Sequence, residues 1–486
     1  MGSKNHDHQL HVVFFPFMAQ GHVIPTIHMA KLFASKGTKV TILSTSHFIP
    51  FISKSIENNT SQIDIINIKF PAAEVGLPEN VNSLHTIDPE MVQKFFQGCG
   101  KLAPQLDQIL EKHRPNCLVA DMFFPWANDV ATKFGIPMLL FHGTCYFALC
   151  ALASVFLHEP HKKISSDSEH FFIPDFPDKI ELTASQIPDP LNYDDESEIT
   201  KLFVTARKGR PWVESRCYGV IVNSFYELEP CYAEHYRNVV GRKAWQIGPL
   251  FLTERKTSNY DNQHECLKWL DSKNPNSVIY VSFGSMASFN DEQLMEIATG
   301  LEASGQQFIW VVKKEKKEGI KDEWLPEGFE ERMKETGLII RGWAPQVSIL
   351  EHEAVGGFVT HCGWNSTLES ICVGVPMVTW PVAAEQFYNE KLVCQILRIG
   401  VEVGAKKWKR QVGDFVKREA ITKAVSKIME GEDAEEMRRR VKSLAEMGRN
   451  AIKEGGSSML DLNALFHDLR SARIAPDSTH HQQNLL

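Results

Sequence analysis

The sequence predicts an α/β protein with two halves, each built on a parallel sheet, that face each other across a cleft. Two series of short apolar strands alternate with helical segments, and a polar stretch at residues 253–263 separates the series. This alternation is typical of βαβ units, whose strands pair in parallel. A chain of 486 residues also exceeds the usual size of a single core, which favours two domains.

The first series opens the chain. Its strands are expected at residues 11–15, 40–43 and 117–120. An irregular loop at residues 16–22 follows the first strand, and residues 24–34 then have helical spacing. The third strand ends at Asp121. Because parallel strands end at a common edge, we expect the loop after the first strand to lie near Asp121.

Residues 136–157 contain no Asp, Glu, Lys or Arg and are long enough to span a bilayer. They also include the helix breakers Pro137 and Gly143. We therefore interpret the segment as a buried strand at residues 137–142, a turn and a buried helix, with no stable membrane insertion. A membrane-embedded protein is the alternative, and fractionation would decide it.

The second series gives the expected domain organisation. Its strands are predicted at residues 277–282, 307–312, 338–341, 357–360 and 375–380, with a helix at 291–303. The predicted parts are a first domain (1–248), a linker (249–264), a second domain (265–456), an amphipathic C-terminal helix (457–473) and a disordered tail (474–486). A solvated loop rich in Lys and Glu is expected at residues 314–323.

Composition excludes some classes of function. The net charge is −8, from 52 basic and 60 acidic residues, which argues against nucleic acid as a partner. Ten scattered cysteines without a Cys-x-x-Cys pair indicate free thiols in a reducing compartment. The polar first eleven residues do not resemble a secretory signal. We expect a cytoplasmic protein.

The densest functional pattern lies at residues 343–386. His361 and Gly363 follow a predicted strand, and Asn365 and Ser366 open a helix. A helix start presents unpaired N–H groups and a positive dipole end, Gly363 lets a ligand approach the backbone, and the other three side chains add donors. This arrangement suits a diphosphate.

Three more residues of this pattern suit a nucleoside. Glu369 lies on the same helix face as Ser366, and its carboxylate can accept two ribose hydroxyls. Trp343 offers an aromatic plane for a base, and Gln346 can pair with base edges or ribose. Taken singly, Asn365 or Ser366 is more often a helix cap, Trp343 a core residue and Glu369 a solvated one. The combination favours a ligand site.

His22 and Asp121 form a candidate catalytic pair. His22 lies at the start of a helix, whose positive end disfavours the imidazolium form, so we expect a neutral, basic ring. Asp121 can accept from one ring nitrogen and set the tautomer. The residues alone leave open that His22 caps a helix and that Asp121 is a turn residue.

The block 343–386 resembles the signature box of the plant secondary-product UDP-glycosyltransferases. It contains Trp-Ala-Pro-Gln, His-Cys-Gly-Trp-Asn-Ser and Ala-Glu-Gln. The resemblance implies the GT-B fold, two Rossmann-like domains with a C-terminal helix that returns to the first. It also implies a UDP-sugar donor site formed by Ser285, Trp343, Ala344, Gln346, His361, Gly363, Trp364, Asn365, Ser366, Glu369, Glu385, Gln386 and Thr144.

The same resemblance covers the candidate catalytic pair. Pro-Phe-Met-Ala-Gln-Gly-His ends at His22, and Asp-Met-Phe-Phe-Pro-Trp begins at Asp121. In the family these motifs carry a His–Asp pair that deprotonates an acceptor hydroxyl and inverts the sugar linkage. No Asp-x-Asp motif is present, so we expect no essential metal and no cofactor besides the donor.

The resemblance also guides the choice of substrates. A final Gln386 favours UDP-glucose over UDP-galactose, and Leu32, with Lys31 beside it, offers no arginine for UDP-glucuronate. The acceptor is expected to be a small apolar flavonoid, other phenolic or triterpenoid, and the protein a monomer. The apolar residues that flank the catalytic pair can line its pocket or belong to the core; they are Phe17, Met18, Phe123, Phe124 and Trp126.

Two other classes of function remain to be weighed. A nicotinamide-dependent oxidoreductase would have Gly-x-Gly-x-x-Gly after the first strand, where this chain has Phe-Met-Ala-Gln-Gly-His. A non-catalytic UDP-sugar or small-molecule binding protein would not need His22 and Asp121, and an activity assay separates it from an enzyme.

Overall fold

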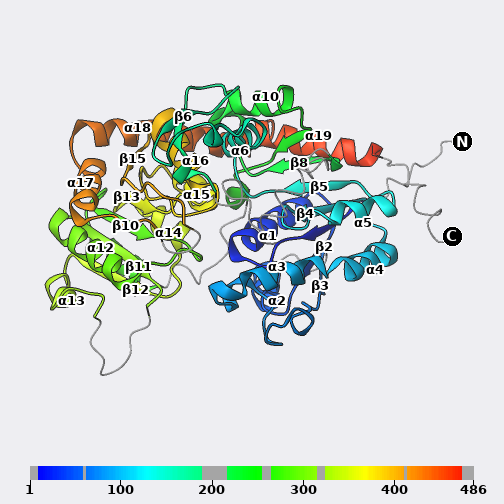
Figure 1. Ribbon diagram of the computed structural model, residues 1–486, viewed down its shortest axis with the longest axis horizontal. Coiled ribbons are helices and arrows are strands. Elements are labelled where there is room, and N and C mark those ends of the chain that lie inside the picture. The colour runs from blue at the N-terminus through cyan, green and yellow to red at the C-terminus, as the bar shows by residue number, and fades with distance from the viewer. Residues whose placement is uncertain are drawn as a thin grey trace, which may run out of the picture.

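The computed structural model describes residues 9–57, 62–188, 216–253, 264–314, 323–409 and 413–472. Figure 1 shows two α/β halves side by side, the first in blue to green and the second in green to orange. Most of the predicted linker, the loop 315–322 and residues 473–486 lie outside the described residues. The boundaries between domains therefore stay predictions.

The first half contains a sheet of seven parallel strands in the order β3-β2-β1-β4-β5-β8-β9. The strands are β1 (His11–Phe15), β2 (Lys39–Ser44), β3 (Ile63–Asn67), β4 (Cys117–Asp121), β5 (Met138–Phe141), β8 (Gly219–Val222) and β9 (Ala244–Gln246). Helices cover both faces, so β4 and β5 are buried throughout.

The helices of the first half are α1 (Gln20–Ser35), α2 (Ile49–Ile56), α3 (Val92–Gly100), α4 (Ala103–His113), α5 (Ala127–Lys133), α6 (Tyr146–His158) and α10 (Pro230–Asn238). A small antiparallel hairpin, β6 (His170–Phe172) and β7 (Glu181–Thr183), follows α6. The segment 136–157 is a strand and a helix, as predicted. Within the described residues, no helix is both long and apolar enough to cross a membrane.

The second half contains six parallel strands in the order β12-β11-β10-β13-β14-β15. They are β10 (Val278–Ser282), β11 (Gln307–Val312), β12 (Gly337–Arg341), β13 (Val355–Thr360), β14 (Met377–Thr379) and β15 (Gly400–Glu402). The predicted GT-B arrangement is confirmed in both halves, because each sheet is doubly wound.

The helices of the second half are α11 (Glu265–Asp271), α12 (Asp291–Ser304), α13 (Phe329–Arg332), α14 (Gln346–Leu350), α15 (Trp364–Val373), α16 (Gln386–Lys391), α17 (Arg418–Met429), α18 (Gly431–Ala451) and α19 (Ser457–Ser471). A π-helical turn at Leu392–Ile396 follows α16. In Figure 1, α18 runs along the second half and α19 lies over the first. Phe466 of α19 packs edge-on against Phe33 of α1.

Helix α1 begins four residues earlier than the helical spacing predicted. It starts at Gln20 and contains Pro25 in its second turn. Proline has no backbone N–H, so the carbonyl of Gly21, four residues before it, receives no helical hydrogen bond from Pro25. His22 therefore lies in the first turn of a helix that has a carbonyl available for another partner.

Candidate active site

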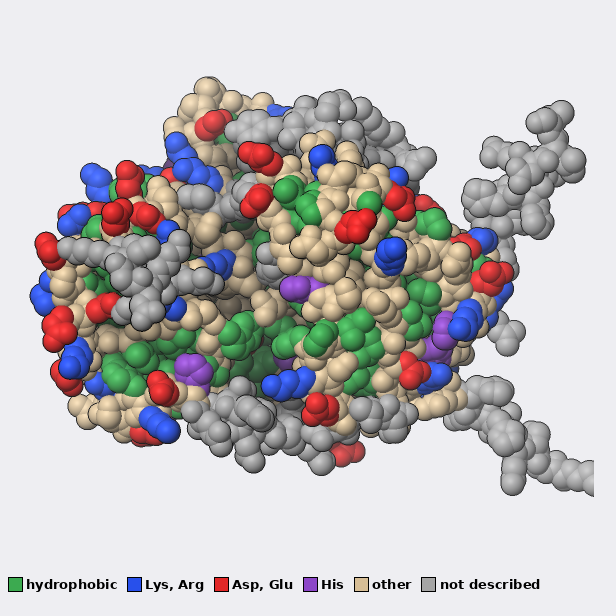
Figure 2. Space-filling view, turned by 90° about the horizontal axis from the view of Figure 1, so that it is seen from below, with side chains coloured by type: hydrophobic (Ala, Val, Ile, Leu, Met, Phe, Trp, Pro, Cys, Tyr) green, Lys and Arg blue, Asp and Glu red, His purple; other side chains and the backbone are tan. Residues whose placement is uncertain are grey.

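The candidate site lies where both sheets reverse their strand order. In the first sheet, β1 and β4 are neighbours, and His22 follows one while Asp121 ends the other. In the second, β10 and β13 are neighbours, and they lead to Ser285 and His361. Open α/β sheets bind ligands at such switch points. Figure 2 shows a hollow between the two halves, with hydrophobic side chains around it.

His22 and Asp121 meet as the sequence predicted. His22 Nδ1 lies 2.6 Å from Asp121 Oδ2, and the Asp121 side chain is 1% exposed while that of His22 is 24% exposed. The other carboxylate oxygen of Asp121 accepts from the amide of Phe123 at 3.1 Å. With Nδ1 donating to the carboxylate, Nε2 is the nitrogen that can accept a proton.

The expected direction of the His22 pKa is wrong. Burial lowers the pKa of His22, but the charge and hydrogen bond of Asp121, with the charge of Glu385, outweigh burial and raise it above the ordinary 6.5. The two carboxylates thus stabilise the imidazolium form more than burial disfavours it.

Glu385 belongs to the second half, and its charge contributes to the raised pKa of His22. Burial raises the pKa of Glu385, and hydrogen bonds from Asn389 and from the amide of Trp364 partly offset this effect. Asn389, one turn further along, was missed by sequence reasoning. Its Nδ2 donates to Glu385 at 3.3 Å and to the carbonyl of Cys362 at 2.8 Å.

The nucleoside residues form one network. Gln346 Nε2 donates to Ser366 Oγ at 3.0 Å and to Glu369 Oε2 at 2.7 Å. Burial raises the pKa of Glu369 to about 7. Trp343 is 63% exposed, so it is not a core residue, and its ring is accessible for stacking. Ala344, beside it, is buried.

The predicted diphosphate residues gather around His361. Burial and the nearby Lys313 ammonium lower the pKa of His361 to about 4, so its ring is neutral at pH 7. A Cβ added at Gly284 or Gly363 would come within 2.6 or 2.4 Å of this ring, so both glycines are needed for its placement. Lys313, which sequence reasoning missed, donates to the carbonyl of Ser285 at 2.6 Å.

Asn365 joins the two halves. Its Nδ2 donates to the carbonyl of Gly21 at 2.8 Å, the carbonyl that Pro25 leaves available in α1. Within the described part of the chain, the buried Oδ1 of Asn365 has no hydrogen-bond partner. Trp364, its neighbour, is buried and donates from its indole to the carbonyl of Asn223 at 2.7 Å. The indole therefore serves the contact between the halves, and the Trp364 amide is the part beside Glu385.

Thr144 and Gln386 lie on opposite sides of this contact. Thr144 is buried just before α6, and its neighbour Cys145 contacts Asn389 of α16. The Oε1 of Gln386 accepts from the amides of Val382 and Ala383, both at 2.8 Å. These two hydrogen bonds therefore help to fix the backbone conformation of the loop that precedes α16.

Of the apolar candidates near the catalytic pair, Phe123 is half-buried, whereas Phe17, Met18 and Phe124 are buried. Phe17 and Phe123 have ring centroids 5.5 and 5.7 Å from that of His22. Phe96 stacks on Phe17 at 5.5 Å. Phe124 is completely buried and stacks on Phe15, which agrees with the core interpretation, and Met18 is also buried.

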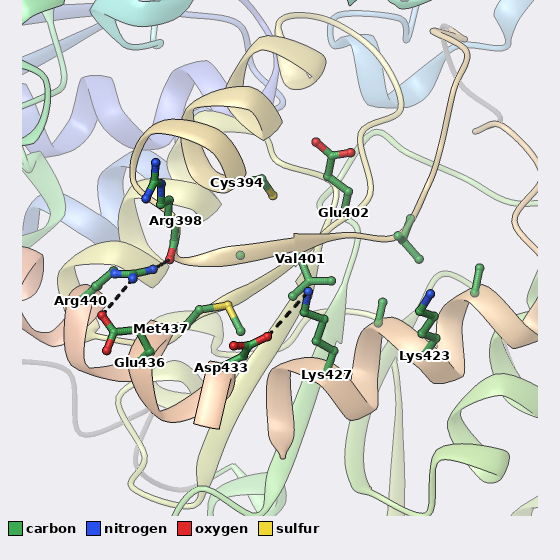
Figure 3. Close-up of a pocket in the computed structure, with 14 residues that line it drawn as sticks. Cys394, Arg398, Val401, Glu402, Lys423, Lys427, Asp433, Glu436, Met437 and Arg440 are labelled. Carbon is green, nitrogen blue, oxygen red and sulfur yellow. Dashed lines mark hydrogen bonds and ion pairs between the residues drawn. The ribbon is translucent and has the colours of Figure 1, made fainter. Parts of the chain in front are cut away.

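A second hollow, of about 650 Å³, lies between β15 and helices α17 and α18 (Figure 3). Four of its charged side chains form two ion pairs, Arg440 with Glu436 and Lys427 with Asp433. None of the predicted site residues lines it. Among the described residues, no group of three or more His, Cys, Asp or Glu side chains is arranged to hold a metal ion.

Comparisons with known proteins agree with this geometry. A family model described as "UDP-glucoronosyl and UDP-glucosyl transferase" matches residues 253–407. A flavonoid 3-O-glucosyltransferase that uses UDP-glucose, from Fragaria ananassa, is 56% identical, covering 95% of this chain and 96% of that protein. A scopoletin glucosyltransferase from Nicotiana tabacum is 53% identical, covering 95% and 98%.

Two solved structures have the same fold. The Glycyrrhiza uralensis protein UGT73P12, complexed with glycyrrhetinic acid 3-O-monoglucuronide, is 40% identical with a TM-score of 0.86, covering 96% of each chain. The Medicago truncatula protein UGT71G1, complexed with UDP-glucose, is 28% identical with a TM-score of 0.78, covering 95% of this chain and 98% of that one.

Proposed function

Because this chain belongs to the plant UDP-glycosyltransferase family, and is a hexosyltransferase that uses a UDP-sugar donor, we propose its sugar, acceptor class and catalytic residues. It transfers glucose from UDP-glucose to a hydroxyl of a small apolar plant metabolite. His22 is the general base and Asp121 its partner. The observation that carries this proposal is the 2.6 Å contact between His22 and the buried Asp121.

The proposed step is a single displacement. His22 Nε2 removes the proton of the acceptor hydroxyl while the hydroxyl oxygen attacks the anomeric carbon of the donor. The new carbon–oxygen bond forms on the side of the anomeric carbon opposite UDP. The bond to UDP breaks, and UDP leaves with the electron pair of that bond. An α-linked donor thus gives a β-glycoside. Asp121 stabilises the imidazolium that forms.

The charge of the departing UDP needs stabilisation. The N-terminus of α15, neutral His361 and Ser366 provide donors that are already in place, and Lys313 adds a positive charge nearby. We therefore expect transfer without an essential divalent metal. Activity should persist in excess EDTA, and complete loss restored by Mg²⁺ would contradict this part of the proposal.

Glucose is the proposed sugar. Glu385 and Gln386 lie at the carboxyl edge of the second sheet, and Glu385 is close enough to His22 to affect its pKa. Hydroxyls of the sugar would therefore meet these residues next to the base. The residue at position 32 is a buried leucine, which cannot pair with a glucuronate carboxylate.

The acceptor is proposed to be a flavonoid, another phenolic or a triterpenoid. The half-buried ring of Phe123 lies beside His22 and packs on the buried rings of Phe17 and Phe96, and a flat apolar acceptor can pack against it. The names of the relatives from Fragaria ananassa and Nicotiana tabacum are consistent with phenolic acceptors. We also propose that the enzyme is a monomer and that it is cytoplasmic; none of its ten cysteines, all within the described residues, forms a disulfide, which agrees with a reducing compartment.

An acceptor panel tests the proposal. UDP-glucose, UDP-galactose and UDP-glucuronate are each supplied with flavonoid, simple phenolic and triterpenoid acceptors. We expect the highest kcat/KM with UDP-glucose. His22→Ala should lower the rate about 10²–10⁴-fold while UDP still binds. A wild-type chain that binds UDP-sugars but transfers none would instead be a non-catalytic binding protein.

Asp121→Asn tests the partner of the base. The amide cannot stabilise an imidazolium, so the rate should fall strongly and the pKa of His22 should fall too. Neutral His22 is the active form, so wild-type kcat/KM should decline as pH falls through a pKa above 6.5. In the variant this decline should move to lower pH. An unchanged rate would leave Asp121 a structural residue.

A further inference from the structure

A segment between β15 and α17 lies against the loop that carries Glu385. We call residues 404–409 the strap, and residues 381–385 the sugar loop. The amide of Lys409 donates to the carbonyl of Val382 at 2.8 Å, and Trp408 Nε1 donates to the carbonyl of Ala384 at 3.0 Å. Trp408 is 9% exposed, so most of its side chain is buried, and this hydrogen bond is partly buried.

The sugar loop has a conformation that needs support from outside. Ala384 has a φ of +50°, in the left-handed region that side chains other than glycine rarely adopt. Such a residue persists only where its surroundings hold it. Ala384 directly precedes Glu385 and Gln386, so its backbone angles set the direction in which both side chains leave the loop.

The other side of the strap is bound to the first half of the molecule. The amide of Trp408 donates to the carbonyl of Ser185 at 2.7 Å, and Ser185 Oγ donates to the carbonyl of Lys406 at 3.0 Å. Ser185 lies in a short turn directly after β7. Trp408 therefore connects Ser185 in the first half to Ala384 in the second.

We propose that Trp408 is a positioning residue for the donor sugar. It holds the carbonyl of Ala384, and this bond keeps Glu385 and Gln386 directed at the sugar while the strap keeps the loop against the first half. The inference rests on the proposed function, in which these two side chains bind the sugar hydroxyls. In this proposal Trp408 acts through the sugar loop, by its hydrogen bond to the carbonyl of Ala384.

The inference predicts different effects on the binding of the sugar and on the binding of the nucleotide. The residues proposed for UDP lie on other elements, with Trp343 after β12, Gln346 on α14, and Ser366 and Glu369 on α15. Loss of the Trp408 hydrogen bond should therefore weaken the binding of UDP-glucose without weakening that of UDP. A general structural defect would weaken both.

Trp408→Phe tests the inference, because phenylalanine can fill much of the space but has no N–H. We expect the KM for UDP-glucose to rise about tenfold, as loss of one buried hydrogen bond can cause, and the preference for UDP-glucose over UDP-galactose to narrow. The inhibition constant of UDP should stay within about twofold of wild type. Trp245→Phe, the same change at a buried residue of β9, should leave both constants unchanged.

Ser185→Ala provides a second variant if Trp408→Phe does not fold. It removes the bond to the carbonyl of Lys406 and should raise the KM for UDP-glucose two- to threefold, again without a change for UDP. An unchanged KM in the folded variant, or equal weakening of UDP and UDP-glucose, would overturn the inference. A wild-type enzyme inactive with every UDP-sugar would instead reject the proposed function, and the two failures are thus distinguishable.

Discussion

At the scale of the residue, burial makes the ionisation of Glu369 depend on pH near neutrality. The carboxyl group has a pKa raised to about 7 because little water reaches it, and the hydrogen bond from Gln346 offsets this only in part. An ionised carboxylate can accept two ribose hydroxyls, whereas a protonated one keeps a proton on one oxygen. The proposed ribose contact thus depends on pH in the neutral range.

The affinity for UDP should follow the ionisation of Glu369. Carboxylate is the binding form, so affinity should be nearly full at pH 8 and fall as the pH drops through about 7. For a pKa of about 7, the ionised fraction drops about tenfold between pH 8 and pH 6. Calorimetric titration of UDP at both pH values checks this expectation.

Glu369→Gln is the control, because glutamine does not ionise. Its UDP affinity should be lower than that of wild type at pH 8. Any pH dependence that remains in this variant belongs to the phosphate of UDP or to other residues. If wild type and variant lose affinity equally toward pH 6, Glu369 does not bind the ribose as a carboxylate.

At the scale of the element, the turn after β10 depends on one glycine. Gly284 has a φ of +68°, and a Cβ there would lie 2.6 Å from the ring of His361. This turn approaches the end of the neighbouring strand β13 because both lie at the switch point of the sheet. The sheet order thus brings Gly284 and His361, far apart in sequence, to one place.

Gly284→Ala should therefore impair the donor site. The methyl group must displace His361, so the KM for UDP-glucose should rise at least about tenfold. In addition, an alanine with a positive φ should lower the free energy of unfolding by about 1 kcal/mol. Steady-state kinetics at saturating acceptor measure it.

The Gly305→Ala variant distinguishes the effect of backbone strain from the effect of contact with His361. Gly305 has a φ of +66° at the end of α12, but an added Cβ would meet nothing within 4 Å. This variant should lose about as much stability as Gly284→Ala but keep the wild-type KM for UDP-glucose. A Gly284→Ala enzyme with wild-type KM would show that His361 does not need its present position.

At the scale of the whole molecule, α19 returns from the second half to the helix that carries His22. Phe466 of α19 packs against Phe33 of α1 with ring centroids 4.9 Å apart. Asp461, on the same helix, accepts from the amide of Gln246 and from Arg237, both at 2.9 Å. The end of the chain therefore stabilises the first half.

Phe466→Ala should destabilise the protein by about 3–5 kcal/mol, because a buried aromatic ring is lost and a cavity remains. Urea denaturation, followed by fluorescence, gives the change in the free energy of unfolding. Leu460→Ala on the same helix is the control, since Leu460 is 57% exposed and its loss should cost less than about 0.5 kcal/mol. Similar losses in both variants would contradict the docking role of Phe466.

The sequence alone determined the α/β class, most strands near the candidate site and the motifs that supply its residues. Strands such as 307–312 are apolar runs whose ends can be recognised from the neighbouring residues. The motifs at His22, Asp121 and 343–386 are continuous in the chain. It did not predict β3, β8, β9 or β15, whose short runs have little contrast with their surroundings. A hydrophobic pattern in a short window of sequence predicts a strand only where the apolar run is clearly marked.

Only the tertiary structure decided how these parts act on one another. Glu385 from the other half adds to the effect of Asp121 in raising the pKa of His22, Asn365 donates to the carbonyl of Gly21, and Trp408 joins Ser185 to Ala384. The partners in these contacts are separated by hundreds of residues or by several strands. Each depends on distance and burial, which exist only once the two sheets are folded and face each other.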